Sequence, residues 1–161
     1  MLNKLLHTEN DYGALFVRLA LGIVMFPHGA QKLLGWFGGY GFAGTMGFFT
    51  ETMGIPYLLA LLVVLAEFFG ALGLIFGALT RIAALGIGGV MLGAIFLVHL
   101  PHGFFMNWSG NQAGEGFEFH LLAIGMSLAL LIRGAGALSI DRLLSNKLDP
   151  ERAAAGHGHN H

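Results

Sequence analysis

The sequence predicts an all-α membrane protein, a bundle of four transmembrane helices with both termini in the cytoplasm. Three observations predict this fold. Of the 161 residues, 55% are hydrophobic and 11% are charged, whereas about a quarter of the residues of a soluble protein are charged. Several apolar stretches approach the roughly 20 residues that a helix needs to cross about 30 Å of hydrocarbon. The basic residues gather on one side of a four-span arrangement, as they do in cytoplasmic loops.

The chain divides into three parts. Residues 1–11 form an N-terminal cytoplasmic segment, residues 12–144 form the four-helix membrane domain, and residues 145–161 form a tail that we expect to be disordered. The N-terminal segment lacks a signal-peptide pattern, because acidic residues and Gly13 separate Lys4 from an apolar run that continues too long. The tail carries His157, His159 and His161, for which a weak divalent-metal site is the alternative to an unstructured end.

Four apolar segments are expected to form the helices: residues 12–34, 56–79, 81–100 and 117–133. Pro56 lies in the first turn of the second helix, where its missing N–H costs little, and Pro101 cannot continue the third helix. Only Thr80 and Arg81 connect the second and third helices. These two helices must therefore be antiparallel neighbours.

Lysine and arginine set the orientation. Those on the side of the two termini are Lys4, Arg81, Arg133, Arg142, Lys147 and Arg152. Lys32 alone lies near the opposite side, so both termini are expected in the cytoplasm and the protein is expected in the inner membrane as a multi-pass protein. The connections 35–55 and 101–116 are rich in glycine and aromatic residues. They are expected to face the outside, at headgroup depth or folded over the bundle mouth.

Composition excludes several functions. The chain has no cysteine, so it cannot itself hold a disulfide, an iron–sulfur cluster or a covalently attached haem. Any redox role therefore needs a bound cofactor or a partner. The net charge of −1 and the absence of a basic run give no indication of nucleic-acid binding.

Ionisable residues within the predicted spans are the first candidates for a site, because each costs at least a few kcal/mol in a bilayer. Arg18, His28 and Lys32 project within roughly 80° of one another on the first helix. Counted from the outer ends, His28 lies about 9 Å deep and Glu67 about 14 Å deep, and Arg18 lies deeper still. Glu67 is therefore expected between His28 and Arg18, as a partner of either. The alternative is a purely structural polar network that fixes helix register.

A second group of polar residues gathers near the outer mouth: His28, Gln31, Lys32, His99, His102, Glu118 and His120. Glu118 and His120 lie about 200° apart on a helix, so both cannot face the bundle. His28 and His99 are a conceivable pair of haem ligands, but we expect no metal or haem. The group instead indicates a small pocket that suits a quinone headgroup, with Phe26, Trp36 and Phe37 packing against the ring or tail. A small anion is the alternative ligand.

The segments RLALGIVMFPHGAQKLLG, AEFFGALGLIFGALTRIAA and GEGFEFHLLAIGMSLALLIRGAGALSID together resemble the DoxX family over residues 15–144. The matching positions are Arg18, His28, Gly29, Lys32, Glu67, Gly77, Arg81 and Glu118. The resemblance implies a four-helix membrane fold and an association with redox metabolism, either as a subunit of a thiosulfate:quinone oxidoreductase or in protection against oxidative and thiol stress. Thiosulfate oxidation would need a partner redox subunit, because this chain has no cysteine to hold a sulfur intermediate.

The favoured hypothesis is a quinone-interacting subunit of a membrane oxidoreductase, with the quinone bound non-covalently. His28 and Glu67 are the expected catalytic residues. The expected ligand-binding residues are Arg18, Gln31, Lys32, His99, Glu118 and His120. The alternatives are an accessory protein that stabilises partners and a small transporter, for which no inverted repeat is evident. The spacings Gly73 to Gly77 and Gly89 to Gly93 allow a homo-oligomer or close internal packing.

Overall fold

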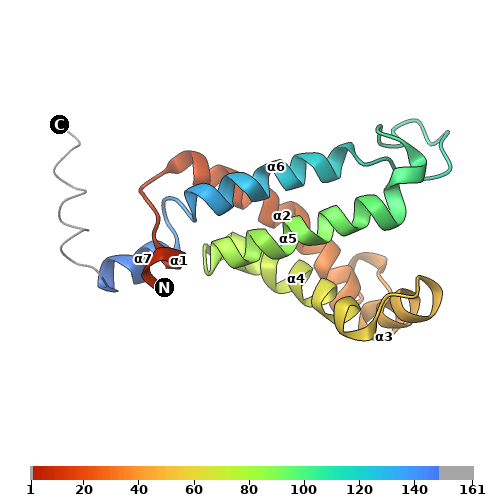
Figure 1. The fold of residues 1–161 in the computed structure, drawn as a ribbon, viewed down its shortest axis with the longest axis horizontal. Coiled ribbons are helices and arrows are strands. Elements are labelled where there is room, and N and C mark those ends of the chain that lie inside the picture. The colour runs from red at the N-terminus through yellow and green to blue at the C-terminus, as the bar shows by residue number, and fades with distance from the viewer. Residues whose placement is uncertain (1, 149–161) are drawn as a thin grey trace.

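The computed structural model describes residues 2–148, and this part of the chain contains helices and loops but no β-strand (Figure 1). The α-helices are α1 (Leu2–Leu6), α2 (Tyr12–Leu34), α3 (Gly41–Gly47), α4 (Tyr57–Phe76), α5 (Thr80–Ala94), α6 (Glu118–Arg133) and α7 (Ile140–Leu148). Shorter helical turns are the 3-10 helices η1 (Trp36–Gly38) and η4 (Leu100–His102) and the π-helices η2 (Phe48–Thr52) and η3 (Ile95–His99). The all-α fold class is confirmed.

The four long helices form a bundle. Helix α2 packs against α4 and α6, and α5 packs against the same two helices. In Figure 1 they run lengthwise, with α1 and α7 side by side at one end and with α3 and the loop before α6 at the other. We call these the terminal end and the cavity end. The predicted helices are all present, with ends shifted by at most a few residues.

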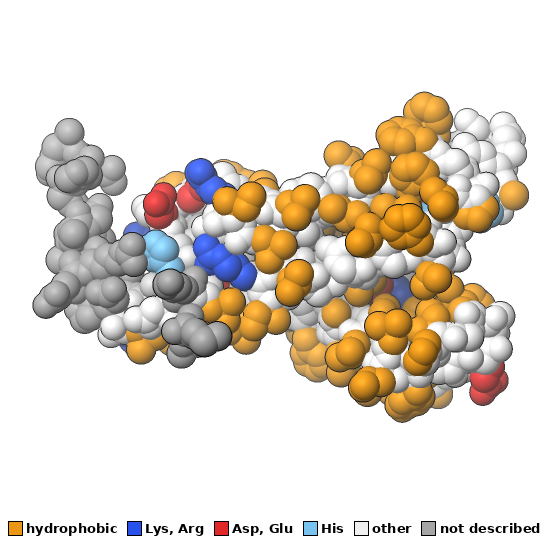
Figure 2. All heavy atoms as spheres, viewed as in Figure 1, with side chains coloured by type: hydrophobic (Ala, Val, Ile, Leu, Met, Phe, Trp, Pro, Cys, Tyr) orange, Lys and Arg blue, Asp and Glu red, His pale blue; other side chains and the backbone are white. Residues whose placement is uncertain are grey.

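Within residues 2–148, three segments are long and apolar enough to cross a membrane: Tyr12–Leu34, Tyr57–Phe76 and Thr80–His102. The last of these continues α5 through η3 and η4. Helix α6 has 16 residues, which at 1.5 Å per residue gives about 24 Å, somewhat less than the hydrocarbon core. Large apolar side chains are exposed on each of the four long helices, and Figure 2 shows many of them on one face of the bundle. Such a surface is typical of helices surrounded by lipid.

Helices α2 and α4 approach closely because α2 presents glycine to its neighbour. A Cβ atom at Gly29 would lie 2.6 Å from Phe68 Cα and 2.8 Å from the carbonyl carbon of Glu67. One at Gly22, two turns earlier, would lie 3.0 Å from Leu74 Cβ. Residues seven apart share a helix face, so the two glycines let the backbones almost touch. This contact brings Glu67 against α2.

The connection between α4 and α5 lies earlier in the chain than predicted, at residues 77–79 instead of at Thr80 and Arg81. We expected the second helix to reach residue 79, but it ends at Phe76, because Gly77 adopts a left-handed conformation with φ 64°. Leu79 is also left-handed, at φ 49°. The buried carboxylate of Asp141 accepts hydrogen bonds from the backbone N–H groups of Leu79 (2.7 Å) and Thr80 (2.8 Å). It thus caps the first turn of α5 from a distant part of the chain.

The N-terminal segment and the predicted tail contain helices that the sequence did not indicate. Helix α1 lies within residues 1–11 and packs against α7. Helix α7 ends at Leu148, so the first four residues of the predicted tail are helical. The rest of that tail, with His157, His159 and His161, lies outside the described residues.

Candidate functional site: a cavity between four helices

A cavity of about 830 Å³ opens at the cavity end, between α2, α4, α5 and the start of α6. Figure 2 shows the hollow, with charged side chains at its base and apolar side chains around its rim. Its walls are mainly aliphatic, aromatic and methionine side chains together with glycine. The polar side chains among them come from Lys32, Glu67, His28, His99, His120 and Glu115.

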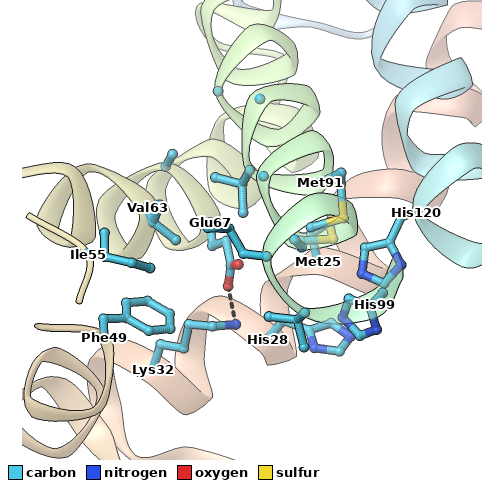
Figure 3. Close-up of a pocket in the computed structure, with 18 of the residues that line it drawn as sticks. Met25, His28, Lys32, Phe49, Ile55, Val63, Glu67, Met91, His99 and His120 are labelled. Carbon is cyan, nitrogen blue, oxygen red and sulfur yellow. Dashed lines mark hydrogen bonds and ion pairs between the residues drawn. The ribbon is translucent and has the colours of Figure 1, made fainter. Parts of the chain in front are cut away.

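An ion pair crosses the base of the cavity. Lys32 Nζ on α2 lies 2.5 Å from Glu67 Oε2 on α4, and Figure 3 shows the two side chains pointing toward one another. The Glu67 side chain is 4% exposed, whereas that of Lys32 is 26% exposed. The partner of Glu67 is therefore Lys32, not the expected His28 or Arg18. A buried carboxylate without such a partner would be strongly disfavoured.

Helix geometry explains this pairing. Side chains lean toward the N-terminus of their own helix. Helices α2 and α4 are antiparallel (Figure 1), so Lys32 leans from the cavity end into the bundle and Glu67 leans out toward it. Arg18 is on the same helix as Lys32 and also leans toward the terminal end, which takes it away from Glu67. Depths counted along the axes omit this tilt, which is why they suggested the wrong partner.

Three histidines lie on the other side of the cavity (Figure 3). The His99 and His120 rings are stacked at a tilt, with their centroids 4.0 Å apart. His99 Nδ1 lies 2.8 Å from the carbonyl oxygen of Glu115. His120 is 6% exposed, and its Nδ1 atom has no hydrogen-bond partner in the described structure. A buried polar nitrogen without a partner is rare and costly, and this one belongs to a side chain that lines the cavity.

Three of the expected ligand-binding residues do not line the cavity. Glu118 faces away, as its 200° separation from His120 requires; its Oε1 accepts hydrogen bonds from Met106 N and Trp108 Nε1, each at 3.0 Å. Gln31 donates to the carbonyl oxygen of Phe37 at 3.2 Å. Both therefore hold the loops at the cavity end in place.

Arg18 is the third. It is 1% exposed and lies at the terminal end, where its guanidinium donates to five backbone carbonyl oxygens: Leu74 and Ile75 (both 2.7 Å), Ala135 (3.0 Å), Leu138 (3.1 Å) and Ala137 (3.3 Å). A guanidinium has five N–H donors, so none is left for a ligand. Arg18 joins the end of α4 to the segment between α6 and α7.

The apolar wall differs from the one that the sequence suggested, because Phe26, Trp36 and Phe37 do not line the cavity and other residues form its walls. Met25 and Met91 lie near the histidines and Phe49 lies near Lys32 (Figure 3). Gly89 and Gly93 form part of the wall on α5. Apolar residues and glycine are common throughout this chain, so no local pattern distinguishes those that line a cavity from those that pack in the core or face lipid.

Metal binding by the described residues has no support. Residues 2–148 contain no group of three or more histidine, cysteine, aspartate or glutamate side chains placed to hold a metal ion. Hydrogen bonding and proton transfer are the other common roles of imidazole.

Comparison with known proteins identifies the family. The family model described as DoxX matches residues 13–100. The chain is 37% identical over 137 residues to "Inner membrane protein YqjF" of Escherichia coli (strain K12), covering 85% of this chain and 95% of that protein. It is 30% identical over 131 residues to "Putative oxidoreductase CatD" of Bacillus subtilis (strain 168), covering 81% of this chain and 86% of that protein. No solved structure matches the chain. With its helical bundle and apolar surface, the chain belongs to the DoxX family of membrane proteins.

Proposed function

We propose that this protein is a quinone-binding subunit of a membrane oxidoreductase system, in which the cavity receives the quinone headgroup. The observation that carries the proposal is the Lys32–Glu67 ion pair at the base of an apolar cavity that also contains three histidines. The protein would cross the inner membrane four times, with α6 as the fourth and shortest span and with both termini in the cytoplasm. The names of the two relatives, "Inner membrane protein YqjF" and "Putative oxidoreductase CatD", support this direction.

The size and lining of the cavity favour a small amphipathic ligand. Binding sites for small molecules typically have volumes of about 300–1,000 Å³, with mostly apolar walls and a few placed polar groups. The cavity, at about 830 Å³, fits this description. A planar ring with polar atoms at its edges would place its faces against the methionine and phenylalanine side chains and its polar atoms against Lys32 and the histidines.

The charges favour a neutral headgroup over a small anion. The fully charged side chains that line the cavity are one lysine and two glutamates, Lys32, Glu67 and Glu115. Because Glu67 already pairs with Lys32, the cavity has no excess positive charge to hold an anion. The ammonium group has three N–H donors, of which the pair with Glu67 uses one. The remaining donors can reach a carbonyl oxygen.

Reduction of a quinone requires hydrogen-bond donors at its carbonyl oxygens and a route for protons. Reduction of a quinone to a quinol takes two electrons and two protons at its carbonyl oxygens. Lys32 would bind one oxygen, and the imidazoles of His28 and His120 would bind or protonate the other. Glu67 would receive or return a proton through Lys32. In this proposal a partner redox subunit supplies the electrons, since the chain has no cysteine and thus no thiol or iron–sulfur cluster of its own. Thiosulfate oxidation and a thiol-stress system are the two settings that the family resemblance offers for that partner.

The test is to purify the protein in mild detergent, extract it with organic solvent and measure bound quinone by mass spectrometry. His28→Ala removes a donor without leaving an unpaired buried charge, so the fold should survive. Gln31→Ala is the matched control, because it changes the same stretch of α2 outside the cavity. Quinone is expected in the wild type and in Gln31→Ala at equal stoichiometry, and at least several-fold less in His28→Ala. Wild-type protein that carries no quinone and binds none when it is added would overturn the proposal.

An accessory role is the second candidate, and the exposed aromatic residues of the outer loops favour it. Tyr40 is 87% exposed and Trp108 is 84% exposed, and both are residue types that often anchor protein interfaces as well as membrane surfaces. In that case the ion pair would only stabilise the fold, and a Glu67→Gln variant would retain any redox activity of the complex per folded molecule.

A further inference from the structure

We infer that the cavity is entered sideways, through a slot between α4 and α5, by a ligand whose apolar tail lies in this slot while its polar headgroup meets Lys32 and the histidines. The inference rests on the proposed function and narrows its ligand to a quinone that carries a hydrocarbon chain and is dissolved in the membrane. It concerns the apolar part of the cavity between α4 and α5, away from the charged residues.

The first observation is that α4 and α5 separate toward the cavity end. Near the terminal end they touch: a Cβ at Gly70 would lie 3.3 Å from Ile87, and one at Gly73 would lie 3.3 Å from Ala83 Cβ. A Cβ at Gly86 would also lie close to α4, 3.3 Å from Ala66 Cβ. Beyond Gly86 the two helices diverge (Figure 1), and their facing residues line the cavity instead of packing together.

The second observation concerns Gly89 and Gly93. A Cβ at either position would meet no atom within 4 Å, and both residues line the cavity. Residues four apart lie on the same helix face, so the glycines form a smooth strip on α5 in the direction of the opening. Two small residues four apart usually indicate close packing between helices. In this chain Gly89 and Gly93 instead border open space. Larger side chains there would narrow the slot.

The third observation is that the slot leads to lipid. On α4, Leu59 and Leu62 line the cavity and are 51% and 53% exposed. On η3, which continues α5, Leu97 lines the cavity and is 60% exposed. These side chains belong at once to the cavity wall and to the apolar outer surface of the bundle. Figure 2 shows the hollow open on this side, with hydrophobic side chains on both edges. A molecule from the hydrocarbon region could reach the cavity without passing the aqueous loops.

The fourth observation is that the inner end of the slot is polar and contains a hydrogen-bonding atom without a partner in the described structure. The His120 side chain is more than nine-tenths buried, its Nδ1 has no partner in the described structure, and it lines the cavity. A glycine strip alone would indicate nothing more than a smooth wall. A strip that runs from lipid to a buried, unpartnered imidazole and an ion pair fits a ligand with a polar head and an apolar tail.

The test compares two quinones on four proteins reconstituted in lipid nanodiscs. The first quinone carries a ten-carbon chain, and the second has the same ring with a methyl group in place of the chain. The proteins are the wild type, Gly89→Leu, Gly93→Leu and Gly125→Leu. The last is the matched control, since Gly125 lies on α6, is exposed and also has nothing within 4 Å of an added Cβ, but does not line the cavity.

Leucine at position 89 or 93 is expected to weaken binding of the long-chain quinone by about tenfold or more, because its side chain fills the slot with roughly the volume that the tail needs. The short quinone should bind with an affinity within about twofold of the wild-type value, and Gly125→Leu should change neither. Unchanged binding of the long-chain quinone to both slot variants would overturn the inference and leave the proposed function intact. A wild type that binds neither quinone would overturn both.

The same samples test whether Gly89 and Gly93 border an entry slot or instead form a contact between two copies of the chain. If Gly89 and Gly93 pack against a second copy of the chain, leucine there would change the oligomeric state, which native mass spectrometry of the nanodiscs measures. A wild-type oligomer that dissociates in Gly89→Leu and Gly93→Leu, but not in Gly125→Leu, would contradict the slot. The inference predicts the same oligomeric state in all four proteins.

Discussion

The two ends of the bundle use similar charged residues in different ways. At the terminal end, the Arg18 guanidinium and the Asp141 carboxylate are buried, and all their hydrogen bonds go to backbone groups of this chain. At the cavity end, Lys32 and Glu67 pair at the base of a cavity, and His120 has a nitrogen with no partner. A polar group whose hydrogen bonds are all satisfied fixes the fold, whereas one with spare capacity can bind a ligand.

The largest expected effect is at the terminal end. Arg18→Ala would remove five hydrogen bonds and leave buried carbonyl oxygens without partners. We expect a loss of roughly 3–5 kcal/mol in the free energy of unfolding, seen as a large fall in melting temperature and in yield of monodisperse protein. Any folded remainder should bind quinone as the wild type does. Normal stability with selective loss of quinone would show that Arg18 belongs with the cavity residues after all.

The second prediction concerns the cavity ion pair. Glu67→Gln leaves Lys32 without its counter-charge, and since Lys32 is about a quarter exposed, we expect a loss of about 1–2 kcal/mol after allowing for screening by solvent. Melting temperature in detergent measures it. The double variant Lys32→Met with Glu67→Gln should recover much of the stability but not the bound quinone. Recovery of both would mean that the pair has no part in binding.

The third prediction tests the cap on α5. Asp141→Asn keeps the shape of the side chain but replaces one carboxylate oxygen with an amide nitrogen, so one of the N–H groups of Leu79 and Thr80 loses its acceptor. We expect a cost of about 1–2 kcal/mol in unfolding free energy. Asp141→Ala should cost more than Asp141→Asn. Bound quinone per folded molecule should be the same in both variants, because the site lies at the other end.

The smallest effect is expected from a surface pair at the terminal end. The hydrogen bond from Arg133 (Nη2 to Oδ2, 2.7 Å) is the main cause that lowers the pKa of Asp11 below its ordinary value of 3.8. Because the folded-state pKa is the lower one, the pair contributes stability above pH 3.8 that is lost as the pH falls through the folded-state pKa.

Asp11→Asn is the control for this pair, because asparagine can still accept the capping hydrogen bond that Asp11 Oδ1 receives from the Ala14 N–H. The melting temperatures of the two proteins should differ slightly at pH 6 and converge toward pH 3. A difference that grows on acidification would contradict the pairing.

The candidate site was predictable in part. Ionisable residues in an apolar chain are rare enough to stand out, and five of the eight expected site residues, His28, Lys32, Glu67, His99 and His120, line one cavity. Sequence patterns alone could not separate Arg18 from these residues, because it shares a helix face with His28 and Lys32. Its role depends on the direction of its side chain and on the carbonyl oxygens near residue 135, which are 117 residues away along the chain.

The sequence by itself determined the helical class, the positions of the four long helices and the membrane environment, because apolar length and sparse charge are properties of local composition. Only the tertiary structure decided that Lys32 pairs with Glu67, since that pairing depends on the close approach at Gly29 and on the opposite tilt of side chains on antiparallel helices. The divergence of α4 and α5 from Gly86 toward the cavity end is likewise visible only in the tertiary structure. An opening between helices depends on how their axes diverge, and residue type alone does not specify that angle.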